Sequence, residues 1–178
     1  SAYRIIAWDA PGYGNSALRN GTLADYVETA TGLLAALNVE HVNILGHSMG
    51  GVIAQGMAGS EGVKVDKLIL SSTFMGHGEP LAEPLQAGYI SRLDDITSMS
   101  PEEFGRARAK SMLASPPSEE IFQEVAKIAS EVKKSGLLSA CEVLNYSDTS
   151  PFLKGFTKPV LIITGRHDKI VLPTRSSK

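Results

Sequence analysis

The segment from residue 42 to residue 58 contains the feature that most restricts the possible fold. The run from Val42 to Leu45 is short and apolar, as is typical of a buried strand, and from Met49 to Ala58 the apolar residues follow a helical pattern. Between them lies the sequence GHSMGG, residues 46–51, which contains a Gly-x-Ser-x-Gly motif. The segment therefore predicts a strand, a one-residue corner at Ser48 and a helix.

The residues of this motif suit nucleophilic chemistry. A serine at such a corner adopts a sparsely populated backbone conformation, which is kept where it serves function. We expect side chains at Gly46 and Gly50 to clash, so that glycine is required at both positions. The N–H of Met49 would lie at a helix N-terminus, where unpaired donors favour negative charge. The motif predicts a nucleophile at Ser48 with one oxyanion donor; the alternative is a glycine-rich turn with an incidental serine.

Three further apolar runs lack polar alternation: Arg4–Trp8, Lys67–Leu70 and Val160–Thr164. Such runs are typical of strands that are covered on both faces. A helical pattern from Thr22 to Leu37 separates the first run from the motif, and Thr22 with Asp25 indicates a capping box. Alternating strands and helices predict an α/β fold with a parallel sheet.

Residues 76–150 interrupt this alternation. Ser100 followed by Pro101 predicts one helix start and Ser118 another, and the second helix has an apolar stripe that we expect to be packed. The stripe consists of Ile121, Phe122, Val125, Ile128 and Val132. We therefore divide the chain into a core of residues 1–75 and 151–178 and a helical insertion of residues 76–150.

Composition excludes several classes of function. With 178 residues, 43% hydrophobic and 20% charged, the chain is expected to be one globular domain. A net charge of −2 and the lack of a Lys/Arg cluster argue against nucleic acid, and no apolar stretch suits a membrane span or a signal peptide. We expect a cytoplasmic protein that needs no metal or cofactor. Cys141 is the only cysteine, which excludes an intrachain disulfide, and we expect it to be a small buried residue.

Three motifs together resemble those of the α/β-hydrolase family over nearly the whole chain. The sequence DAPGYGNS, residues 9–16, resembles the family's D-x-x-G-x-G-x-S loop, and GHSMGG resembles its nucleophile elbow. The sequence PVLIITGRHD, residues 159–168, resembles the strand and turn that carry the acid, and residues 76–150 resemble the helical cap of many members. In style the chain is similar to enol-lactonases, cofactor-free haloperoxidases and carbon–carbon bond hydrolases.

The resemblance implies a serine hydrolase of small esters, lactones or activated carbon–carbon bonds. Ser48 would be the nucleophile, Met49 N–H one oxyanion donor, and Asp168 the carboxylate that orients a catalytic histidine. In the family that histidine follows one more strand after the acid, whereas this chain ends about ten residues after Asp168. The second oxyanion donor comes from a loop that precedes the first strand seen here. We therefore expect a fragment that lacks both ends and is nearly inactive alone.

Of the four histidines, His77 is the best surrogate base, because its loop follows the strand that ends near Leu70 and emerges at the same edge as Ser48. The alternative for His77 is a hinge residue of the cap. The other three are expected to be badly placed: His41 at the far end of the sheet, His47 pointing away from the serine, and His167 beside its own orienting acid.

The family's strand order places a strand that is missing here between Arg4–Trp8 and Val42–Leu45. We therefore predict either that these two strands pair directly or that a second chain fills the slot, as in a homodimer formed through exposed sheet edges. Two other functions remain open: a truncated, non-catalytic small-molecule-binding or interaction protein of the same fold, and peroxidation or lyase chemistry on the same triad.

Overall fold

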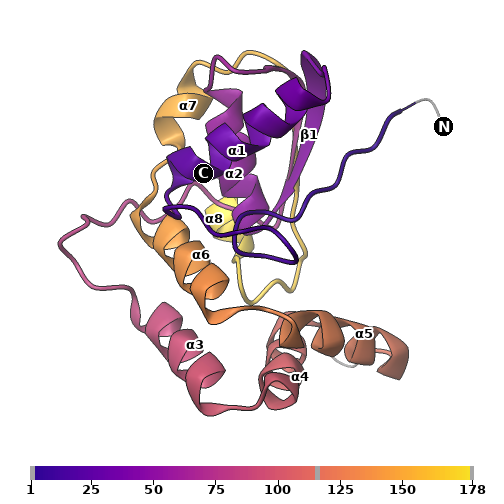
Figure 1. The fold of residues 1–178 in the computed structure, drawn as a ribbon, viewed down its shortest axis with the longest axis vertical. Coiled ribbons are helices and arrows are strands. Elements are labelled where there is room, and N and C mark those ends of the chain that lie inside the picture. Colours follow the sequence, from indigo (N-terminus) through magenta and orange to yellow (C-terminus); the bar gives the residue numbers. More distant parts are fainter. Residues whose placement is uncertain (1–2, 115–116, 177–178) are drawn as a thin grey trace.

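A computed structural model describes residues 3–114 and 117–176. Their sheet has three parallel strands in the order β1 (His41–His47), β2 (Lys64–Ser71) and β3 (Val160–Ile163). In the register of the sheet, Leu45 lies beside Ile69, and Ile69 lies beside Leu161. The predicted parallel α/β sheet is confirmed, and its carboxyl edge gathers the ends of all three strands (Figure 1).

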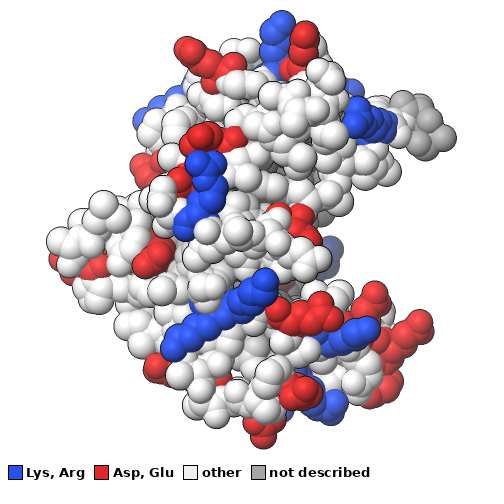
Figure 2. All heavy atoms as spheres, viewed as in Figure 1, with Lys and Arg blue, Asp and Glu red and all other residues white. Residues whose placement is uncertain are grey.

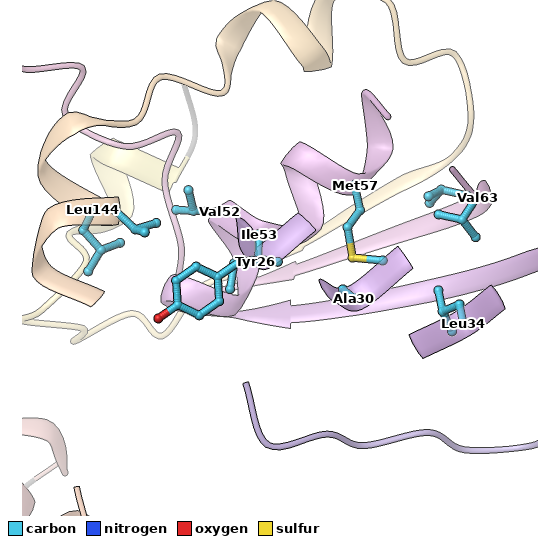
Figure 3. Close-up of a cluster of buried hydrophobic side chains, with 10 residues drawn as sticks. Tyr26, Ala30, Leu34, Val52, Ile53, Met57, Val63 and Leu144 are labelled. Atoms are coloured by element: carbon cyan, nitrogen blue, oxygen red, sulfur yellow. The ribbon is translucent and has the colours of Figure 1, made fainter. Parts of the chain in front are cut away.

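Two helices cover one face of this sheet. They are α1 (Leu23–Ala36), which is capped by the predicted reciprocal bonds of Thr22 and Asp25, and α2 (Met49–Ala58). The main core lies between these helices and the sheet (Figure 3). Its buried side chains are Tyr26, Ala30, Leu34, Val52, Ile53, Met57, Val63, Val65, Val143 and Leu144.

The opposite face of the sheet is uncovered in the part of the chain that is described. Leu45 is 64% exposed and Leu161 is 54% exposed, although both are apolar. All four residues of β3 are exposed, so the expectation that every strand is covered on both faces is wrong. Since α1 and α2 pack on one face only, Ile44 and Leu68 belong to the apolar clusters beneath these helices, whereas the residues next to them in the sequence do not.

Residues Arg4–Trp8 form no strand, which corrects the prediction that they pair directly with Val42–Leu45. The segment runs past β1 as an extended thread (Figure 1). A groove of about 1200 Å³ separates the two, lined by Ile5, Ile6 and Trp8 on one side and by Val42 and Ile44 on the other. Hydrogen bonds between paired strands require the strands to lie about 4.8 Å apart. The two segments lie on either side of the groove and do not pair.

The helical insertion contributes four helices between β2 and β3: α3 (Ala87–Ser98), α4 (Pro101–Met112), α5 (Glu119–Ser130) and α6 (Lys134–Tyr146). The predicted helix starts are confirmed, with a capping box at Ser100 and a side-chain cap at Ser118. The prediction that the α5 stripe is packed is wrong in part. Ile121 and Ile128 are more than half exposed, because α5 meets α4 through its alanines instead.

Helix α6 joins the insertion to the core. Val143 and Leu144 belong to the main core, whereas Leu137 and Cys141 pack against Phe104 of α4. Cys141 is fully buried, as expected. Two short helices, α7 (Ser150–Lys154) and α8 (Pro173–Ser176), flank β3 in the sequence. The surface is indented on one side between the core and the insertion (Figure 2). Among the described residues, no helix is long and apolar enough to cross a membrane.

Candidate active site

Ser48 lies at a sharp corner between β1 and α2. Its φ of 52° and ψ of −122° place a non-glycine residue in the left-handed half of the backbone map, a strained conformation. Two long-range bonds hold it there. The Ser48 N–H donates to the Ser71 carbonyl at 3.0 Å, and the Thr73 hydroxyl donates to the Ser48 carbonyl at 2.7 Å. The strand, corner and helix therefore have the arrangement that the sequence predicts.

The glycines around the corner have unequal roles. A Cβ on Gly46 would collide with the Gly50 carbonyl oxygen and lie 2.6 Å from the Gly51 Cα, as expected from the sequence. A Cβ on Gly50 would meet nothing within 4 Å, so the expectation of a clash there is wrong. Gly50 is already within α2, where its Cβ direction points to open space. Gly51 is the second crowded position, since Thr73 lies against it, and sequence analysis missed this contact.

Met49 is the first residue of α2, and its N–H has no hydrogen-bond partner among the described residues. The amide of Gly51, two residues further along α2, is bonded to the Ser48 carbonyl at 2.9 Å. An unpaired amide at the positive end of a helix favours a developing negative charge. The N–H of Met49 therefore lies next to Ser48 without a hydrogen-bond partner among the described residues.

Asp168 lies in the loop after β3, half-buried. Its carboxylate accepts hydrogen bonds from the N–H groups of Ile170 and Val171, each at 2.9 Å. Burial raises the pKa of Asp168, but hydrogen bonds from Val171, Ser72 and Ile170, together with the nearby His47, outweigh burial and hold the pKa below its usual value. Asp168 is therefore a fixed carboxylate that stays ionised at neutral pH.

The ends of the strands bring these groups to one edge of the sheet. His47, Ser71 and Ile163 are register partners at the carboxyl ends of β1, β2 and β3. Ser48 and Asp168 follow the first and the third of these ends. Ser72 follows the second, has a positive φ of 44° and donates its N–H to the Ile163 carbonyl at 2.9 Å. Sequence analysis missed Ser72 and Thr73, because neither belongs to a recognisable motif.

His77 lies at the start of the insertion, where its side chain is already engaged. Nε2 is 3.1 Å from the Tyr89 hydroxyl and 3.4 Å from Nη1 of Arg175, while Nδ1 is 2.9 Å from Nε2 of Gln86. Burial, and then the charge of Arg175, lower the pKa of His77, which Glu79 partly opposes. None of the hydrogen bonds of His77 reaches Ser48 or Asp168.

The other histidines also make no hydrogen bond to Ser48. His41 Nδ1 lies 3.2 Å from the Asp66 carboxylate, at the end of the sheet opposite Ser48. His47 Nδ1 lies 3.2 Å from the Ser71 hydroxyl. His167 is exposed in the loop of Asp168. Within residues 3–114 and 117–176, no cluster of three histidine, cysteine or acidic residues could hold a metal ion.

Comparison with solved structures supports the fold. An esterase from Exiguobacterium antarcticum superposes with a TM-score of 0.81 at 20% identity, covering 94% of this chain and 65% of that one. An enol-lactonase from Burkholderia xenovorans superposes with a TM-score of 0.79 at 21% identity, covering 94% of this chain and 64% of that one.

Comparison with related sequences supports the same fold. The chain is 26% identical over 170 residues to 3-oxoadipate enol-lactonase 2 of Acinetobacter baylyi, covering 94% of this chain and 62% of the relative. It is 28% identical over 193 residues to a 2-hydroxy-6-oxononadienedioate/2-hydroxy-6-oxononatrienedioate hydrolase of Dechloromonas aromatica, covering 96% and 62%. The chain thus spans just under two thirds of the length of these relatives. The model of the alpha/beta hydrolase fold matches residues 1–178, and the chain belongs to the α/β-hydrolase family.

Proposed function

We propose that this chain supplies the nucleophile and the acid of a serine hydrolase that acts on small esters or lactones, or on activated carbon–carbon bonds. One observation carries the proposal. Ser48 occupies a strained corner beside the unpaired Met49 N–H, at the edge of the sheet where Asp168 is held ionised. Hydrolase relatives within the same family support this reaction class.

In the proposed reaction, Ser48 Oγ attacks the carbonyl carbon, and the Met49 N–H donates to the resulting oxyanion. Collapse of this intermediate breaks the bond to the leaving group, which takes up the proton from the serine, and leaves an acyl-enzyme. Water then attacks the acyl carbon, which releases the acid and restores the Ser48 hydroxyl. Each transfer needs a base that first accepts and then returns the proton.

We propose that this base is a histidine outside these 178 residues, oriented by Asp168. The four histidines present form no hydrogen bond to Ser48, and His77 is committed to Tyr89, Gln86 and Arg175. Loss of a triad base costs about 10⁶ in turnover, and a residual factor of about 10³–10⁴ over the reaction in water comes from the remaining groups. The chain alone is accordingly expected to turn over very slowly.

The substrates are proposed to be small molecules bound beneath residues 76–150, which act as a cap over a core of residues 1–75 and 151–178. The insertion begins after the carboxyl end of β2, and its two ends lie side by side, since the Thr149 N–H donates to the Met75 carbonyl at 2.9 Å. The relatives include an enol-lactonase and a hydrolase named for a dioate, which supports lactones or activated carbon–carbon bonds as targets.

A non-catalytic binding protein is the second candidate, favoured by the absence of a hydrogen bond between Ser48 and any of the four histidines. Treatment with a fluorophosphonate probe, followed by peptide mapping, separates the two functions. A competent nucleophile is labelled stoichiometrically at Ser48, labelling is lost in Ser48→Ala, and it is retained in the control Ser60→Ala, whose serine lies after α2. The test uses a protein that carries these 178 residues together with the proposed histidine, and if Ser48 of that protein remains unlabelled under all conditions, the protein is a binding protein.

A further inference from the structure

Two arginines of the insertion lack an acidic partner. Arg92 of α3 and Arg108 of α4 are both half-buried. Within the described residues, neither lies within ion-pair distance of a carboxylate. The Arg92 guanidinium lies 5.8 Å from the centre of the Tyr89 ring, and Nη1 of Arg108 donates only to the Ser111 hydroxyl at 3.2 Å. Two desolvated cations without a counter-ion are costly and call for an explanation.

Packing of the insertion brings these two arginines together. Tyr89 of α3 and Phe104 of α4 belong to the same apolar cluster, which also contains Cys141 of α6. Arg92 follows Tyr89 by three residues and Arg108 follows Phe104 by four, so each arginine shares the helix face of its clustered neighbour. Burial, and then the charge of Arg92, lower the pKa of Arg108 to about 10. The two positive charges therefore repel each other.

Hydroxyl groups, rather than acids, surround this pair. Burial, and then Tyr26 and Cys141, raise the pKa of Tyr13 to about 12, while Arg92 acts in the opposite sense. The loop of Tyr13 is fixed to the start of α6, because Lys133 Nζ donates to the Gly14 carbonyl at 2.7 Å. Asp95 is the acid that influences Arg108, yet it lies beyond ion-pair distance.

A short series of contacts links the arginines to the nucleophile. Tyr89, which carries Arg92 over its ring, bonds to His77, and His77 meets the Phe74 ring edge-on with the ring centres 4.9 Å apart. Phe74 directly follows Thr73, whose hydroxyl bonds to the Ser48 carbonyl. Arg92 is thus connected to the candidate active site through Tyr89, His77 and Phe74.

We propose that Arg92 and Arg108 bind a carboxylate of the substrate whose reacting bond lies at Ser48. This inference rests on the proposed function and specifies its substrate class as an anionic ester, lactone or ketone. A carboxylate offers two oxygen atoms to the planar guanidinium groups and removes their mutual repulsion.

Isothermal titration calorimetry with adipate tests this inference on the chain as it exists, with 1,6-hexanediol as the uncharged match and inorganic phosphate as a second anion. We expect adipate to bind more tightly than either. Arg92→Gln and Arg108→Gln each weaken adipate binding by at least about 10-fold. The control Arg106→Gln, an exposed arginine of the same helix that lies over the Phe122 ring, leaves binding unchanged.

Equal binding of adipate and hexanediol, tighter binding of phosphate, or unchanged affinity in both arginine variants would overturn the inference. A salt titration of the unaltered chain needs no variant to fold: adipate affinity must fall between about 0.05 M and about 0.5 M NaCl, and a constant affinity contradicts the inference. Fluorophosphonate labelling of Ser48 is read in parallel on a protein that carries these residues together with the proposed histidine. Labelled Ser48 without adipate binding overturns the carboxylate site alone, whereas adipate binding without labelling overturns the proposed function alone.

Discussion

The backbone conformation of Ser48 depends on contacts from residues that are distant in the sequence. The carbonyl of Ser71 and the hydroxyl of Thr73 hold the corner, and the Ser176 hydroxyl in turn donates to the Thr73 carbonyl at 2.9 Å. A positive φ at a non-glycine residue costs about 1–3 kcal/mol, which the surrounding structure must offset. The Ser48 hydroxyl makes no capping hydrogen bond to α2.

Replacing each glycine of the corner by alanine tests whether a side chain is sterically excluded at that position. Gly46→Ala forces a Cβ against the Gly50 carbonyl oxygen and should destabilise the fold by about 1–3 kcal/mol. Gly50→Ala introduces a Cβ into open space within α2 and should leave stability unchanged or raise it by up to about 1 kcal/mol. Urea denaturation of both variants measures the difference. Equal losses of stability at the two positions would contradict this account of the corner.

His77 makes the fold sensitive to mild acid. Its pKa is lowered in the folded state by burial and by Arg175, so the unfolded chain, with a histidine pKa of about 6.5, binds the proton first. Stability contributed by neutral His77 is therefore intact above about pH 6.5 and decreases as pH falls below it. Between about pH 7.5 and about pH 5.5, the melting temperature of His77→Gln should fall by less than the melting temperature of the unaltered chain. An identical loss in both proteins would exclude this role.

At the scale of single elements, the N-termini of α1 and α4 are each capped by residues from the same short stretch of sequence. The Thr22 hydroxyl accepts from the Asp25 N–H at 3.2 Å, while the Asp25 carboxylate accepts from the Thr22 N–H at 3.0 Å. Ser100 and Glu103 form the same pair of bonds at the start of α4. Each box satisfies backbone donors that the helix itself leaves unpaired.

Removal of the cap of α1 should weaken the core, because Tyr26 and Ala30 reach the core from that helix. Thr22→Ala is expected to cost about 1 kcal/mol in the free energy of unfolding. Thr29→Ala changes the same residue type within α1, where the hydroxyl donates to the Asp25 carbonyl and accepts a long hydrogen bond from Arg19 at 3.5 Å, and should cost less. Denaturant melts of both variants measure the difference, and a larger loss for Thr29→Ala would refute the importance of the cap.

At the scale of the whole molecule, the uncovered face of the sheet predicts association. Leu45 and Leu161 are exposed on that face, and the outer edge of β1 faces a groove rather than another strand. Exposed apolar surface beside an unpaired edge favours contact with another chain. We therefore propose that two copies associate through this side of the sheet.

Sedimentation velocity tests this proposal. The unaltered chain should show concentration-dependent dimers, and Leu161→Lys should shift the population towards monomers. Leu81→Lys is the matched control, because Leu81 is 83% exposed but lies in the loop before α3, away from the sheet. Monomers at every concentration, or equal effects of the two substitutions, would contradict the proposal.

Sequence predicts those parts of the molecule whose causes are local. The limits of α1 follow from its cap and its periodicity, those of α2 follow from periodicity, and Gly46 marks the place of the corner at Ser48. The prediction of a strand at Arg4–Trp8 is wrong, because a strand forms only where a second strand lies close enough to pair with it. The crowding at Gly51 comes from Thr73, and the Arg92–Arg108 pair comes from two helices. Such contacts form only when distant segments pack together.

Acyl transfer to Ser48 is the central claim, and the most direct test is mass spectrometry after reaction with 4-nitrophenyl acetate, using a protein that carries these 178 residues together with the proposed histidine base. The account predicts one acetyl group on the peptide that contains Ser48, released together with one equivalent of 4-nitrophenolate, and no such adduct in Ser48→Ala. Acetylation of other residues only, or an equal adduct in Ser48→Ala, would contradict the account.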